Sequence, residues 1–242
     1  MRGDTMTNRE TAALLEAIRI IAETTTNPVD IIRAIDRITE KLKDPQRVQF
    51  VFIDTKFTEL RMYQELPHTW RYVNDATAAA QVLGSVLQET LNRAKRASAQ
   101  GLKRSEEADL YVCIDELGDL IFTDRGVINT LARIAMLGRA ANVHLIAGTQ
   151  CPNRKTLSAE FASNCPARVG LRCQDVIESR QIIGTPDAVN LPAHGMAYYT
   201  SPDYLQPQLV KIPFYPDEQL RERVAWWTAQ APAQLNRITP MW

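Results

Sequence analysis

The fold is decided by residues 110–152, which read LYVCIDELGDLIFTDRGVINTLARIAMLGRAANVHLIAGTQCP. Leu110 to Ile114 is a run of strand-forming apolar residues with no polar alternation, which is typical of a parallel strand covered on both faces. Apolar residues at helical spacing predict a helix over 126–141, and a second apolar strand is predicted over 143–148. A strand, a helix and a strand in this order indicate two parallel strands of an α/β sheet.

Polar residues follow both of these strands. Asp115 and Glu116 come directly after the first, and Thr149 and Gln150 come after the second. In an open α/β sheet, ligands bind at the carboxyl ends of the strands. We therefore expect Asp115 to hold a hydrated Mg²⁺, Glu116 to orient an attacking water, and the Gln150 amide to reach a terminal phosphate. The alternative is an ordinary strand end whose acids are solvated.

The rest of the chain extends this α/β pattern. A strand is predicted over 48–54, a long helix over 75–97 and a further strand over 167–171. Residues 196–199 and 208–212 predict a β-hairpin joined through a proline-containing loop. Because strands alternate with helices, we predict a mostly parallel sheet with helices on both faces.

Composition limits the class of protein. The 242 residues include 28 Lys and Arg and 28 Asp and Glu, so the formal net charge is zero and gives no global attraction to nucleic acid. A ring could still confine its basic groups to a pore. No apolar run approaches the roughly eighteen residues that span a bilayer, and no signal-peptide pattern begins the chain. We therefore expect a cytoplasmic protein without a transmembrane segment.

The four cysteines give no sign of a metal site. Cys113, Cys151, Cys165 and Cys173 form no CxxC pair and have no metal-ligand spacing. They are predicted to be free thiols in a reducing compartment.

Several ordered motifs resemble the motor domain of FtsK/SpoIIIE-type DNA translocases. IDELGDL resembles that family's Walker B segment, and RAANVHLIAGTQCP resembles its segment ending in ATQRP, with Cys151 in place of the usual Arg. The resemblance extends from about Val48 to about Gln230. It also includes VFIDTKFTELRMYQELPH at 51–68, SNCPARVGLRCQDVIESRQII at 163–183 and FYPDEQLRERVAWWTAQ at 214–230.

The resemblance implies a RecA-like P-loop NTPase core that uses ATP and Mg²⁺, moves along double-stranded DNA and works as a homo-oligomeric ring, a hexamer in that family. It also implies that Thr149 lies at the nucleotide and that a cationic side chain completes the active site of the adjacent subunit. Arg168 is the first choice for this trans role, ahead of Arg139 and Arg180. Lys56, after another strand, is expected to face the nucleotide pocket or the subunit interface.

A phosphate-binding loop is missing from the sequence. No GxxxxGK followed by Ser or Thr occurs, although this loop supplies main-chain N–H groups, a lysine and a hydroxyl to bound phosphates. Residues 2–11 offer one degenerate register, with Gly3, Arg9 and Thr11 at loop positions. Residues 23–30 offer another register. Its distance from the strand that ends at Asp54 fits the family better, but its side chains are less suited to binding phosphate. Such losses weaken nucleotide binding by several kcal/mol.

Three explanations for the missing loop stay open: a degenerate subunit, an amino end that is truncated or rearranged, or a site completed by a neighbouring chain. We therefore divide the chain into a helical segment at 1–46 that contains the degenerate loop region, a motor core at 47–230 and a tail at 231–242. The alternative function is a non-catalytic structural or regulatory subunit, similar to modules of secretion-system ATPases, that binds protein partners and assembles with an active subunit.

Three aromatic residues are predicted to be structural. His144 lies within an apolar strand and is expected to be a core histidine with its hydrogen bonds satisfied rather than a ligand. Trp226 and Trp227 are expected to pack, one of them toward the core, because neighbours on a helix lie about 100° apart.

Overall fold

The computed structural model describes residues 46–230, apart from positions 58, 193, 194, 213 and 215. The degenerate loop registers and the tail therefore lie outside the described residues. Within the described part of the chain, no helix has both the length and the hydrophobicity needed to cross a bilayer.

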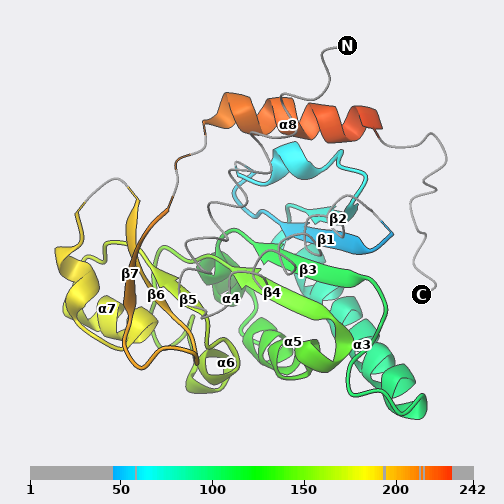
Figure 1. Ribbon diagram of the computed structural model, residues 1–242, viewed down its shortest axis with the longest axis horizontal. Helices are drawn as coiled ribbons and strands as arrows, with labels where there is room; N and C mark the ends of the chain where they lie inside the picture. The colour runs from blue at the N-terminus through cyan, green and yellow to red at the C-terminus, as the bar shows by residue number, and fades with distance from the viewer. Residues whose placement is uncertain (1–45, 58, 193–194, 213, 215, 231–242) are drawn as a thin grey trace, which may run out of the picture.

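A four-stranded parallel sheet forms the centre of the molecule (Figure 1). Its strands are β1 (Val48–Ile53), β2 (Thr69–Val73), β3 (Asp109–Ile114) and β4 (Val143–Ala147), and their order across the sheet is β2-β1-β3-β4. All three pairings are parallel. The predicted parallel pair, β3 and β4, is therefore confirmed, and β1 adds to it on the other side.

Helices α3 (Ala76–Ala99) and α5 (Val127–Ala141) pack together against one face of this sheet, with α4 (Leu117–Thr123) beside them. Asp75 caps α3 by accepting a hydrogen bond from the Ala78 N–H at 2.8 Å. The apolar stripes of these helices meet the buried sides of the strands in one core. Its fully buried members include Val51, Leu83, Val86, Val112, Leu131 and Ile134.

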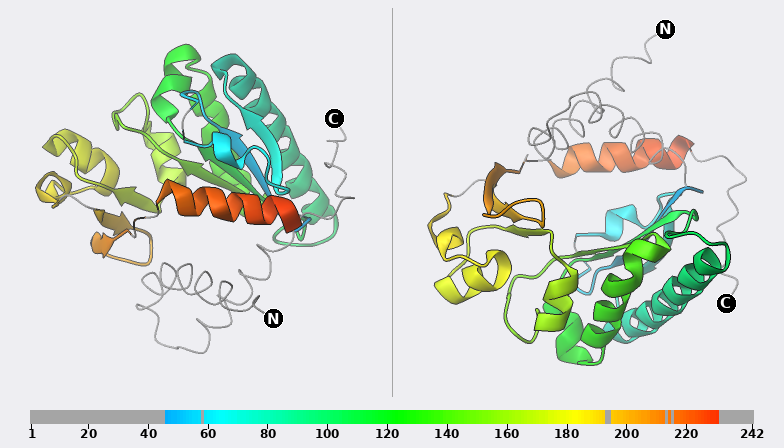
Figure 2. Two further views of the ribbon diagram at one scale, coloured as in Figure 1. Left: turned by 90° about the horizontal axis from the view of Figure 1, so that it is seen from above. Right: turned by 60° about the horizontal axis from the view of Figure 1, so that its bottom comes forward.

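The opposite face of the sheet carries an aromatic row. Phe50, Tyr111 and His144 are direct neighbours across β1, β3 and β4, and their rings stack at centroid distances of 5.6 and 4.6 Å. Helix α8 (Asp217–Gln230) lies on this side, so helices flank both faces, as predicted (Figure 2).

Helix α8 packs differently from the prediction. Trp227 contacts His68, in the turn before β2, at a ring distance of 5.3 Å, and Trp226 is 46% exposed. No described residue of α8 is buried. The expectation that one of the two tryptophans faces the core is therefore wrong, because α8 rests on the loop around η1 (Arg61–Tyr63) and not on the sheet.

A smaller antiparallel sheet lies beside the parallel one (Figures 1 and 2). The predicted hairpin is present as β6 (Met196–Thr200) and β7 (Gln208–Lys211), and β5 (Arg168–Gly170) pairs with β6. Helix α7 (Val176–Ile183) packs against this sheet. Gly170 permits that contact, because a Cβ there would lie 2.7 Å from an Ile183 methyl carbon. The short α6 (Ala159–Asn164) and η2 (Asp187–Asn190) complete the elements.

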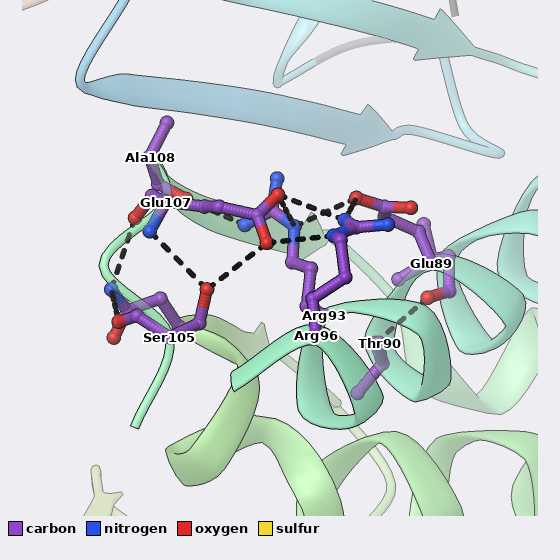
Figure 3. A network of polar contacts seen from close by, with 9 residues as sticks. Glu89, Thr90, Arg93, Arg96, Ser105, Glu107 and Ala108 are labelled. Carbon is purple, nitrogen blue, oxygen red and sulfur yellow. Dashed lines mark hydrogen bonds and ion pairs between the residues drawn. The ribbon is translucent and has the colours of Figure 1, made fainter. Parts of the chain in front are cut away.

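The amino edge of the parallel sheet is closed by a network of charges (Figure 3). Arg93 is nearly buried and donates to the Ala108 carbonyl at 2.6 Å and to Glu89 at 3.0 Å. Arg96 donates to Glu89 at 2.9 Å and to both oxygens of Glu107 at 2.8 and 3.0 Å. The network fixes the second half of α3 to the segment that leads into β3.

Candidate functional site

Main-chain hydrogen bonds continue beyond the carboxyl ends of β3 and β4. The Asp115 N–H donates to the Ile53 carbonyl at 3.0 Å, and the Gly148 N–H donates to the Ile114 carbonyl at 2.8 Å. Gly148 is required here, because a Cβ would lie 2.5 Å from the Asp115 carbonyl oxygen. The ladder therefore places the loops after the two strands side by side, as their sequence predicted.

Glu116 is the centre of this edge. Its Oε1 accepts hydrogen bonds from the Gly118 N–H at 3.0 Å and the Thr149 hydroxyl at 2.9 Å. Its Oε2 accepts from the Gln150 N–H at 3.0 Å and the Lys56 ammonium at 3.5 Å. The residue is 5% exposed. Because a carboxylate offers about four acceptor positions, this set of donors fills it.

The same contacts decide the charge of Glu116. Burial favours the neutral form, but the hydrogen bonds from Gln150, Gly118 and Thr149, together with the Lys56 charge, outweigh burial and hold the pKa below its usual range. The carboxylate is therefore charged at neutral pH.

Asp115 has the opposite environment. Partial burial raises its pKa first, and the neighbouring charges of Asp54 and Glu59 raise it further, while Lys56 acts against them. Among the described residues, none donates a hydrogen bond to the Asp115 carboxylate. A half-buried carboxylate with open oxygens fits a hard cation such as Mg²⁺, which takes one or two carboxylates and completes its shell with water and phosphate.

The turn after β1 delivers two side chains to the same place. Thr55 donates to Asp119 at 3.3 Å, and Lys56 reaches Glu116. The next residue, Phe57, has φ of 62°, a left-handed conformation that is uncommon for a bulky side chain and costs about 1–3 kcal/mol. Asp54 is fully buried at the start of this turn. Sequence reasoning identified Lys56, whereas the strained Phe57 gave no local signal.

A cavity of about 660 Å³ opens beside Glu116. Three cationic residues line it: Lys56 from the turn after β1, Arg125 from the loop between α4 and α5, and Lys155 from the loop after β4. No local motif marks Arg125 or Lys155 as a site residue, because the cavity is formed by three loops that are distant in the chain. The other lining residues are Glu116, Gly118, Asp119, Ile121, Phe122, Ile128, Gln150, Cys151, Asn153 and Thr156.

The predicted site residues fall into three groups: four that meet at the carboxyl edge, three outside the described residues, and Arg168, which lies elsewhere. Asp115, Glu116, Thr149 and Gln150 come together at the carboxyl edge. In this arrangement Gln150 holds Glu116 through its main chain, and its side chain lines the cavity. Gly3, Arg9 and Thr11 lie outside the described residues.

Arg168 lies away from this edge. Its guanidinium donates to the carbonyls of Ala162 at 2.5 Å, Cys165 at 2.9 Å and Ile182 at 3.3 Å. These contacts join the ends of α6 and α7 within one chain, so the trans role would require Arg168 to leave three carbonyls. That role stays a prediction.

His144 has a polar partner, as predicted, but it is not a core residue, because its side chain is 32% exposed. Its Nε2 lies 3.0 Å from Asp109 Oδ1, and its ring stacks on Tyr111. Arg139 and Arg180 are exposed. The four cysteines are free thiols, and the described residues contain no cluster of His, Cys, Asp and Glu that could hold a metal by itself.

Comparison with known proteins agrees with this geometry. Residues 41–110 match the model of the FtsK/SpoIIIE family. DNA translocase FtsK 1 of Neisseria meningitidis serogroup A is 28% identical over 223 residues, covering 78% of this chain and 28% of the relative. DNA translocase FtsK of Helicobacter pylori strain 26695 is 30% identical over 208 residues, covering 80% of this chain and 24% of the relative. The chain thus spans about a quarter of the length of these relatives.

Solved structures share the fold. The conjugation coupling protein TcpA of pCW3, solved as a monomer with ATPγS, aligns with a TM-score of 0.67 at 20% identity over 81% of this chain and 60% of TcpA. The cytoplasmic domain of the type VII secretion ATPase EccC from Thermomonospora curvata aligns with a TM-score of 0.62 at 18% identity over 84% of this chain and 26% of EccC. The core is α/β and RecA-like, as expected for a P-loop NTPase. By sequence and by fold, the chain carries a motor domain of the FtsK/SpoIIIE type.

Proposed function

We propose that this chain is an ATP-hydrolysing motor module that moves along double-stranded DNA as part of a homo-oligomeric ring. One observation carries the proposal: the acids after β3 and the Thr149-Gln150 pair after β4 converge, with the Thr149 hydroxyl and the Gln150 N–H 2.9 and 3.0 Å from the Glu116 carboxylate. The names of the relatives, DNA translocases, support the same function.

Each residue at the edge has a role in this proposal. Asp115 holds Mg²⁺ together with the phosphates of ATP, and Mg²⁺ when bound neutralises phosphate charge. Glu116 accepts a proton from, or orients, the attacking water, and Thr149 and Gln150 position it. The formal net charge of zero gives no global attraction to DNA, so the proposal requires basic groups gathered at a local surface, which contact the DNA backbone without reading sequence.

The proposal also assigns roles to the amino-terminal segment and the tail. We assign the degenerate phosphate loop to 1–46, with Gly3, Arg9 and Thr11 as its phosphate-side residues, the motor core to 47–230 and the tail to 231–242. We also assign the module to the cytoplasm. A neighbouring subunit that supplies phosphate contacts would compensate for the missing glycines and lysine.

A triplex-displacement assay tests the motor function. The purified chain should displace a third strand from duplex DNA in the presence of ATP, and the E116Q variant should fail while it still binds the duplex. Removal of a general base lowers the rate by about 10²- to 10⁴-fold. Displacement by E116Q at the rate of the unaltered chain would remove Glu116 from the proposed reaction.

A non-catalytic subunit is the second candidate. Two observations favour it: GxxxxGK followed by Ser or Thr is absent from the sequence, and all four acceptor positions of Glu116 are filled. Calorimetry with ATP on this chain and on a variant with a restored GxxxxGKT loop distinguishes the motor function from the non-catalytic function. Tight binding only after restoration, together with assembly onto an active subunit, supports the non-catalytic function. Equal, tight binding by both contradicts a decayed loop.

A further inference from the structure

Lys56 is the weakest of the four donors to Glu116. Its Nζ lies 3.5 Å from Oε2, whereas the other three donors lie between 2.9 and 3.0 Å. Its side chain is also 36% exposed, while that of Glu116 is 6% exposed. Among the donors, Lys56 is therefore the one that can leave with least rearrangement.

The position of Lys56 connects Glu116 to the cavity. Lys56 follows β1, and the next residue, Phe57, holds the turn in a strained left-handed conformation. The 660 Å³ cavity that Lys56 lines also receives Arg125 and Lys155 from two other loops. Among the described residues, no hydrogen bond or ion pair occupies the charged end of Arg125 or Lys155.

The charges around this cavity favour an anion. Three cationic side chains line it against two acidic ones, and both acids are engaged, Glu116 by its four donors and Asp119 by the Thr55 hydroxyl. A phosphate group offers several strong acceptor oxygens and carries more charge than a single carboxylate, so it competes well for a lysine ammonium.

We propose that this cavity binds a phosphate group, and that the bound phosphate draws the Lys56 ammonium away from Glu116. One acceptor position on Oε2 then becomes free. The consequence for hydrolysis rests on the proposed function, in which Glu116 binds the attacking water. While the cavity is empty, all four acceptor positions of Glu116 are filled. When phosphate occupies the cavity, one position on Oε2 is free to accept a hydrogen bond from that water. Phosphate from a nucleotide and phosphate from a DNA backbone share this chemistry.

Binding of inorganic pyrophosphate, measured by calorimetry, tests the competition without any hydrolysis. K56M should bind about tenfold more weakly or worse, since one charge-assisted contact is lost. E116Q should bind about tenfold more tightly, since the competing carboxylate is gone. D119N removes a negative charge from the same cavity without touching Lys56, so its effect should be clearly smaller. K103M, at an exposed lysine outside the cavity lining, should bind as the unaltered chain does.

A short blunt DNA duplex, titrated in parallel, identifies the source of the phosphate. Binding of pyrophosphate alone that depends on Lys56 assigns the cavity to a nucleotide or polyphosphate, and binding of the duplex alone assigns it to the DNA backbone. Either result supports the proposal. No binding of either probe, equal affinity in K56M and K103M, or an E116Q effect no larger than that of D119N would overturn it. A lack of ATP turnover would count against the proposed function and leave this result unchanged.

Discussion

The two edges of the parallel sheet differ in how their charges are used. At the amino edge, Arg93 and Arg96 are surrounded by partners, and their contacts with Ala108 and Glu107 join α3 to the segment before β3 (Figure 3). At the carboxyl edge, Asp115 accepts no hydrogen bond from the described residues, and the turn at Phe57 is strained. The amino edge is built for stability, whereas the carboxyl edge keeps groups available for a ligand.

Removing the Asp115 carboxylate should produce the largest change in ATP turnover. We expect D115N to lower ATP turnover by roughly a hundredfold or more, because the metal loses a protein ligand. Its free energy of unfolding should stay the same or rise, since burial and like charges disfavour the Asp115 carboxylate. Turnover and urea denaturation on the same preparation check this. If unfolding of D115N explained its whole loss of turnover, Asp115 would serve stability and not ligand binding, which would contradict the contrast between the two edges.

Removing a charged partner from the amino edge should lower stability and leave turnover unchanged. R93A leaves the Ala108 carbonyl without its donor and Glu89 with Arg96 as its remaining partner, so loss of the nearly buried guanidinium should destabilise the fold by about 1–3 kcal/mol. Urea denaturation measures the loss. Turnover per folded molecule should not change. R96A is the matched control: because its side chain is 47% exposed, its effect should be much smaller.

A single added methyl group at the carboxyl edge should give an intermediate effect. In G148A the Cβ meets the Asp115 carbonyl oxygen, and relieving that overlap costs about 1–3 kcal/mol. G84A, in α3, is the control, because nothing lies within 4 Å of its new Cβ. It should be neutral or stabilising by about 0.5–1 kcal/mol. Equal stability of the two variants, measured by thermal unfolding, would contradict the close approach of the strands.

Acid should weaken the amino edge through Glu107. Its hydrogen bond from Arg96 holds the pKa below the ordinary value of 4.5, although burial acts in the opposite sense. Because the folded-state pKa is depressed, this contribution is complete above pH 4.5 and is lost as pH falls through the folded value. The unfolding free energy of E107Q should therefore depend less on pH below 4.5 than that of the unaltered chain. Parallel curves for the two proteins would argue against the contribution.

The smallest effect concerns thiol reactivity. Burial raises the pKa of Cys113 to about 11, so almost none of it is thiolate at neutral pH. Cys151 is exposed at the carboxyl edge. Mass spectrometry after brief alkylation should find Cys151 modified first and Cys113 last. Early modification of Cys113 would indicate that the sheet face around it opens.

Local pattern was enough to predict the core, because β3 and β4 are apolar runs whose register fixes where Asp115 and Gln150 emerge. It did not predict the set of donors that fills Glu116, three of which come from two loops far from it in sequence, the turn after β1 and the loop after β4. It also missed that β5 joins the hairpin and that Arg168 binds three carbonyls. Such long-range pairings depend on the assembled fold, and a residue type at one position does not encode them.

DNA-stimulated ATP turnover by the purified chain would show whether the carboxyl edge hydrolyses nucleotide although no GxxxxGK followed by Ser or Thr occurs in the sequence. We expect measurable turnover that rises with duplex DNA and is lost in E116Q, while R96A keeps it. Absence of turnover in the folded, DNA-bound chain, or the same turnover in E116Q, would contradict it.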